Sequence, residues 1–155
     1  MKFSTREDIN APIEQVFSAL CDFEGFERQA MRRGAEVQRI DTLHEPGVGM
    51  RWQVDFTMRG RQRNVELELS RFDVPNEMVF SAKSAGMDGT FSIELIALSR
   101  TRTRMSIALE MLPLNLSARL LIQSLKLAKV TLSKRFKLRV ADYAKGLEER
   151  LERSA

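Results

Sequence analysis

The last quarter of the chain repeats apolar residues at the period of an α-helix. From Ser117 to Arg153 the sequence contains no proline and a single glycine, Gly146. We therefore predict one uninterrupted helix of about 37 residues, which at ~1.5 Å per residue is roughly 55 Å long. Apolar steps of three and four residues mark the face that needs a partner. This stripe consists of Leu121, Leu125, Ala128, Leu132, Phe136, Val140, Ala144, Leu147 and Leu151.

Most of the preceding chain alternates apolar and polar residues, which is the period of a β-strand with one dry face. Residues 2–9 fit an edge strand, and six further strands follow Gly34, separated by turns. Pro12 and Asp22 fit the N-terminal ends of two short helices in between. Clean alternation favours antiparallel pairing. We expect an α+β fold in which a curved seven-stranded antiparallel sheet wraps round the long C-terminal helix, with two short helices after the first strand.

The bulk composition is that of one globular domain. The 155 residues are 43% hydrophobic and 30% charged, and no stretch approaches the ~20 apolar residues of a membrane span. The first residues lack the apolar core of a signal peptide, and the lone cysteine, Cys21, excludes an internal disulfide. We therefore expect a cytoplasmic protein. The net charge of +4 permits anionic partners without requiring nucleic acid.

The segment from Ile9 to Phe23, Ile-Asn-Ala-Pro-Ile-Glu-Gln-Val-Phe-Ser-Ala-Leu-Cys-Asp-Phe, resembles the opening of START-like proteins, the SRPBCC superfamily. That superfamily includes birch-pollen-allergen-like proteins, polyketide cyclase/dehydratases and lipid-transfer domains. The turn from Gly47 into a strand at Trp52 and the final helix are also similar to the family. The resemblance covers residues 1–155 and implies a single START-like domain with the helix-grip fold. Because its motifs are caps, turns and core positions, it points to a fold and not to an activity.

Family members use the space between sheet and helix for hydrophobic ligands, as carriers, sensors or, less often, enzymes. In this chain the inward-facing residues are nearly all apolar, so an open cavity would hold hydrocarbon or aromatic groups. The alternative is that the same side chains fill a closed core. The expected ligand-contacting residues are Trp52, Val54, Phe56, Met58, Val65, Leu67, Leu69, Phe80, Phe91, Ile93, Leu95, Met105, Ile107, Leu109, Leu121 and Leu125.

In the family's topology, alternate loops cluster at the cavity mouth. In this chain those loops carry guanidinium groups beside apolar residues. Such a rim suits an amphipathic acid with its carboxylate or phosphate held there, and it also suits transient docking on an anionic membrane surface. For any single arginine the alternative is a solvated turn. The expected mouth residues are Arg32, Arg59, Arg61, Met87 and Leu114, with Arg33, Arg63, Leu116 and Leu120 beside them.

Few residues suggest catalysis. His44 is the only histidine and Cys21 the only cysteine, which argues against a metal site or a Cys/His couple. We assign no catalytic residue, no metal and no cofactor. Glu7 and Asp88 are the acids that an enzyme of the cyclase or dehydratase type would use. The middle of the long helix is basic at 126–139, but the strand faces offer no exposed aromatic platform on which bases could stack. We therefore expect no specific nucleic-acid binding.

From the sequence we predict non-enzymatic binding or transport of a small hydrophobic ligand, anionic in the favoured interpretation, between the sheet and the C-terminal helix. Two alternatives stay open. One is a polyketide cyclase/dehydratase-like enzyme, and the other is a protein-interaction module with a closed core. A monomer and a homodimer both fit the sequence.

Overall fold

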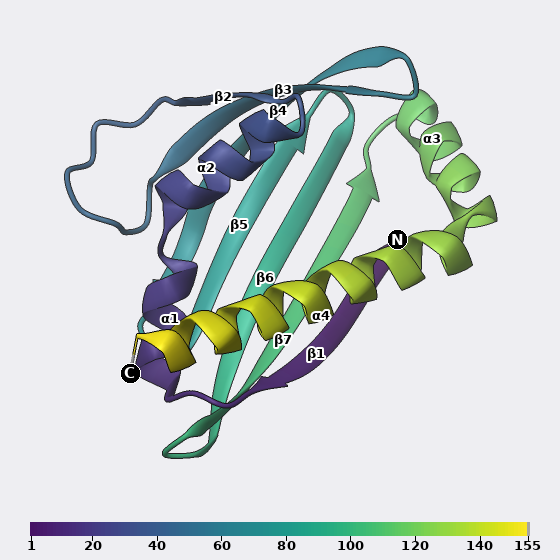
Figure 1. Ribbon diagram of the computed structural model, residues 1–155. Helices are drawn as coiled ribbons and strands as arrows, with labels where there is room; N and C mark the ends of the chain where they lie inside the picture. Colours follow the sequence, from purple (N-terminus) through teal and green to yellow (C-terminus); the bar gives the residue numbers. More distant parts are fainter. Residues whose placement is uncertain (155) are drawn as a thin grey trace.

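The computed structural model describes residues 1–154, which form a curved seven-stranded antiparallel sheet with four helices (Figure 1). The strand order is β1-β7-β6-β5-β4-β3-β2, so the first strand pairs with the last. The α+β helix-grip fold expected from the sequence is confirmed. The elements are β1 (Lys2–Ile9), α1 (Ile13–Leu20), α2 (Phe23–Arg32), β2 (Glu36–Arg39), β3 (Arg51–Met58), β4 (Arg61–Asp73), β5 (Glu77–Ser84), β6 (Met87–Ser99), β7 (Arg102–Pro113), α3 (Leu116–Leu127) and α4 (Lys129–Arg153).

The two short helices begin where the sequence predicts. Pro12 is the N-cap residue of α1, which buries Val16, Phe17 and Leu20. The Asp22 carboxylate accepts a hydrogen bond from the backbone N–H of Gly25 (3.1 Å) and so caps α2. Both helices cover one end of the concave face of the sheet (Figure 1).

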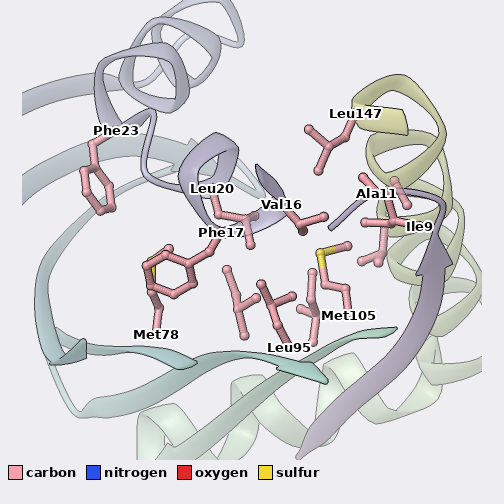
Figure 2. Close-up of a cluster of buried hydrophobic side chains, with 14 of the residues drawn as sticks. Ile9, Ala11, Val16, Phe17, Leu20, Phe23, Met78, Leu95, Met105 and Leu147 are labelled. Carbon is pink, nitrogen blue, oxygen red and sulfur yellow. The ribbon is translucent and has the colours of Figure 1, made fainter. Parts of the chain in front are cut away.

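The hydrophobic core fills that same end of the molecule. Figure 2 shows side chains of α1 gathered with those of the sheet and of α4. Ile9, Met105 and Leu147 are almost fully buried there, and Val140 and Ala144 continue the buried face of α4. The C-terminal part of the predicted apolar stripe is therefore a packing stripe.

The C-terminal helix is broken at Ala128, so the prediction of one uninterrupted helix from Ser117 to Arg153 was wrong. At Ala128 the backbone (φ −106°, ψ 15°) leaves the helical region, and its N–H bonds to the carbonyl of Leu125, three residues back (3.0 Å). The helix resumes when the N–H of Leu132 bonds to the carbonyl of Ala128 (2.9 Å). The apolar period continues through the break, which is why the pattern did not reveal it.

The two helical segments follow different surfaces. α4 lies against β1 and crosses the concave face of the sheet (Figure 1). α3 instead lies past the C-terminal end of β7 (Figure 1). Asn115 caps α3 by accepting a hydrogen bond from the backbone N–H of Ala118 (2.8 Å). The N–H of Leu114 bonds to the carbonyl of Gly86 in the turn between β5 and β6 (2.7 Å). The start of α3 is thus tied to the sheet, and the break at Ala128 sets its other end.

Candidate functional site

A cavity of about 690 Å³ lies between the concave face of the sheet, α3 and the first half of α4. This volume is within the range of ~300–1,000 Å³ usual for small-molecule sites. The cavity lies at the α3 end, away from the filled core. Its lining consists of Phe3, Phe56, Met58, Arg61, Arg63, Val65, Ala82, Ser84, Ala85, Met87, Gly89, Leu109, Met111, Ser117, Ala118, Leu120, Leu121, Leu125, Leu132 and Phe136.

A change in side-chain size along β5 and β6 separates the filled core from the cavity. Phe80 and Phe91 are directly opposite each other, with ring centroids 6.3 Å apart, and both pack against the core. The next pair of inward-facing residues, two positions further along each strand toward the β5–β6 turn, is Ala82 and Gly89. Two small residues replace two rings and leave the floor open beneath α3. Inward-facing small residues on neighbouring strands were the sequence signal for this cavity.

Two arginines form the charged part of the cavity wall. Arg61 and Arg63 pair with Met58 and Phe56 across the β3–β4 hairpin, on the same face of β4 as Val65. The Nε atom of Arg63 is buried and has no hydrogen-bond partner within residues 1–154. Neither guanidinium forms an ion pair with a residue in this described range. Buried N–H donors are normally satisfied, so this donor is open to an acceptor from outside the chain.

The charged side chains of the cavity lining are all positive. Besides the two arginines its only polar side chains are Ser84 and Ser117, and it contains no aspartate or glutamate among the described residues. The wall across the sheet from Arg63 is aromatic, where Phe3 and Phe136 lie with ring centroids 5.9 Å apart. Because β4 and β1 are four strand spacings apart, the two walls are about 19 Å apart along the arc of the sheet. The cavity therefore has a basic end and an apolar end.

The hairpin between β3 and β4 meets α3 at the rim. Arg59 (φ 53°) and Gly60 (φ 74°) both have a left-handed backbone, as a two-residue hairpin turn requires. The guanidinium Nη1 of Arg59 donates a hydrogen bond to the Ser124 hydroxyl on α3. The turn thus places one arginine at the rim, outside the lining, and the next two inside.

The structure divides the residues expected at the site into two groups. Of the sixteen ligand contacts and five mouth residues expected, the cavity lining includes Phe56, Met58, Val65, Leu109, Leu121, Leu125, Arg61 and Met87. The other contacts belong to the filled core or pack against it: Trp52, Val54, Leu67, Leu69, Phe80, Phe91, Ile93, Leu95, Met105 and Ile107. Arg32 and Leu114 are exposed and Arg59 is at the rim. Sequence reasoning missed the floor residues Ala82 and Gly89 and placed Arg63 only beside the mouth.

The residues considered for catalysis lie outside the cavity lining. Glu7 on β1 pairs with Met105 on β7 and is not part of the lining. Asp88 is next to the inward-facing Gly89, so its side chain is on the other face of β6. Burial raises the pKa of the Cys21 thiol, which disfavours its nucleophilic thiolate form. Within residues 1–154 no group of three or more histidine, cysteine, aspartate or glutamate side chains is arranged to hold a metal ion.

None of the four described helices is both long enough and apolar enough to span a membrane.

Comparisons with solved structures identify the fold. Over 97% of this chain and 95% of the other, the structure is similar to Zhui aromatase/cyclase from Streptomyces sp. R1128 (TM-score 0.67, 11% identity). It is also similar to TTHA0849 from Thermus thermophilus (TM-score 0.66, 18% identity, 100% and 99% covered). A START superfamily protein from Mycobacterium smegmatis matches with a TM-score of 0.60 and 16% identity, over 99% of each chain. No protein-family model and no curated protein matches the sequence. At these identities the likeness establishes the START-like fold.

Proposed function

We propose that this protein, which has the START-like helix-grip fold, binds a small hydrophobic molecule with a negatively charged end in the cavity beneath α3, without catalysis. One observation carries the proposal: an apolar cavity whose lining contains two guanidinium groups and no carboxylate. The single cysteine, Cys21, supports the cytoplasm as the compartment in which it acts.

The two ends of the cavity suggest how such a ligand lies. Its carboxylate or phosphate would accept hydrogen bonds from Arg63, whose buried Nε has no partner, and from Arg61 nearer to solvent. Hydrogen bonds between charged groups in a partly desolvated site are stronger than neutral ones. The hydrocarbon or aromatic body would extend across the sheet toward Phe3 and Phe136. The methionines Met58, Met87 and Met111 allow the lining to adapt to its shape.

The two alternative functions are less well supported. A cyclase or dehydratase needs a group that accepts or donates a proton beside the substrate, and the lining provides arginine and serine but neither carboxylate nor imidazole. The similarity to an aromatase/cyclase is therefore an argument about the fold alone. An interaction module with a closed core does not account for a cavity of this size.

The test compares two ligands with the same length of carbon chain, one with an anionic and one with a neutral headgroup. Isothermal titration with dodecanoate and with dodecanol should show that both bind and that the acid binds more tightly. Gly89→Phe, which fills the cavity floor, should abolish both. Thr90→Phe places the same ring on the outer face of β6 and should change neither affinity. Absence of binding for both ligands, or equal behaviour of the two variants, would refute the proposal.

Native mass spectrometry of the protein as purified identifies a ligand already carried. An apolar acid bound in a one-to-one complex would support the proposal directly. Conversion of such a molecule to a product during incubation would favour the enzymatic alternative.

A further inference from the structure

The outer face of α3 carries a row of leucines that are largely exposed in the described chain. Leu116, Leu120 and Leu127 are 71%, 57% and 92% exposed, and their spacing of four and seven residues places them on one side of the helix. The opposite side, with Ala118 and Ile122, is buried. A helix of twelve residues thus has apolar residues on both faces, and only one face is used by the fold. We call Leu116, Leu120 and Leu127 the outer leucine row.

The charged residues of α3 and of the chain that follows it, as far as Arg139, are all basic. No aspartate or glutamate occurs between Glu110 and Asp142. On α3 itself, Arg119 and Lys126 are each one residue from a member of the row and lie on one flank of it. The basic residues of the acid-free stretch are Arg119, Lys126, Lys129, Lys134, Arg135, Lys137 and Arg139.

This combination of leucines and positive charge narrows the choice of partner. A nucleic acid would neutralise the charges but leave the leucines without stacking or hydrogen-bonding groups to match. A second copy of the same face would bring like charges together. A bilayer containing anionic lipids satisfies both features, since apolar side chains enter the acyl boundary while lysine and arginine pair with the headgroups.

We propose that α3 docks the protein on anionic membranes, with the outer leucine row inserted into the interface and Arg119 and Lys126 on the headgroups. Leu120 belongs both to the row and to the cavity lining, so a docked α3 brings the cavity rim to the lipid surface. The docking surface is independent of what the cavity holds, and it stands or fails separately from the proposed ligand binding.

Vesicle sedimentation of the whole protein, without added ligand, tests this surface. The protein should bind vesicles of phosphatidylcholine with phosphatidylglycerol at least about tenfold more tightly than phosphatidylcholine alone, and high salt should weaken the binding. Leu116→Ser with Leu127→Ser should reduce the binding at least about tenfold. Arg119→Gln with Lys126→Gln should reduce it about tenfold and weaken its salt dependence.

The matched control removes two exposed apolar side chains elsewhere. Val48 and Leu98 are 60% and 43% exposed, in the segment before β3 and near the β6–β7 turn, both away from α3. Val48→Ser with Leu98→Ser should bind vesicles like the unmodified protein. Circular dichroism melting verifies that every variant is folded. Equal binding to the two vesicle types, no vesicle binding at all, or equal losses in the leucine and control variants would each overturn the proposal.

Discussion

Arg59 and Ser124 join the tip of the β3–β4 hairpin to the C-terminal half of α3 by a side-chain hydrogen bond between residues 65 positions apart in sequence. The start of α3 is also held to the sheet by the backbone hydrogen bond from Leu114 to Gly86. At its other end, the break at Ala128 separates α3 from α4. The Arg59–Ser124 hydrogen bond thus holds α3, which covers the cavity, against the β3–β4 hairpin. Both partners are near solvent, so the bond is weak enough to open.

We expect that removing this fastening speeds ligand exchange. In Arg59→Ala or Ser124→Ala, the rates of dodecanoate uptake and release should both rise severalfold, because α3 moves away from the hairpin more often, while the equilibrium affinity changes less. Stopped-flow fluorescence with a displaceable apolar probe measures both rates. The two single variants and the double variant should behave alike, since each removes the same bond. Unchanged rates would show that ligands pass elsewhere.

The sign of the ligand's charge is tested by changing Arg63 alone. Arg63→Met keeps most of the length of the side chain and removes its donors. Because hydrogen bonds to charged groups are worth about 1.5–3 kcal/mol, dodecanoate affinity should fall by roughly ten- to a hundredfold. Dodecanol affinity should stay constant or rise. Titration calorimetry gives both constants.

Arg33→Met is the matched control for that variant, because Arg33 is exposed just after α2 and outside the cavity lining. It should leave both affinities unchanged. Equal losses for the acid and the alcohol in Arg63→Met would show that the residue supports the cavity and does not select for charge.

The fold was predictable because the information for it is local and periodic. Alternation along the strands, a proline before α1 and an aspartate before α2 each specify their element through nearby atoms. The break at Ala128 was not predictable in this way. No proline or glycine marks it, and the apolar period runs on through it. It depends on which surface each half of the helix meets, and that is a property of the assembled molecule.

The site was predictable by face but not by position along the face. Trp52 and Phe56 have the same inward parity on β3, yet Trp52 belongs to the core and Phe56 lines the cavity. The difference comes from what each side chain faces. Trp52 contacts Phe23 of α2 and Phe80, with ring centroids 5.7 and 6.0 Å away. Phe56 instead faces the cavity that it lines together with Leu121 and Leu125 of α3. The sequence of a single strand determines which side chains face inward. Whether the space in front of them is filled depends on several elements together.

A buried hydroxyl at the far end of the sheet should matter for stability. Thr103 is fully buried, and its Oγ1 donates to the carbonyl of Ala11 (2.8 Å), which holds the start of α1 against β7. Thr103→Val keeps the shape and removes the donor, so the free energy of unfolding should fall by about 1–3 kcal/mol. Urea denaturation measures the loss. Thr101→Val, exposed in the β6–β7 turn, should cost less than about 0.5 kcal/mol.

Asp41 should make the stability depend on pH in the acid range. Its carboxylate accepts hydrogen bonds from Arg39 (Nε, 2.9 Å; Nη2, 3.0 Å) and from the backbone N–H groups of Leu43 (2.9 Å) and Arg51 (2.8 Å). The Arg39 guanidinium, and after it the backbone donors, hold the pKa of Asp41 far below its ordinary value of 3.8 despite the opposing effect of desolvation. These bonds fix the segment between β2 and β3 against the start of β3.

The sign of the pH effect follows from proton uptake. In the unfolded chain Asp41 protonates near its ordinary pKa of 3.8, whereas the folded protein keeps it ionised to lower pH, so the unfolded state binds more protons as the pH falls. Its contribution is therefore complete at neutral pH and declines below about pH 4. Asp41→Asn should lower the free energy of unfolding at pH 7 by on the order of 1–3 kcal/mol. Urea denaturation at a series of pH values should show this difference shrinking below about pH 4. The control Glu45→Gln, at an exposed position in the same segment, should change the free energy of unfolding at pH 7 by less than about 0.5 kcal/mol. A difference that stays constant down to acid pH would mean that the amide's geometry, and not the lost charge, causes the destabilisation.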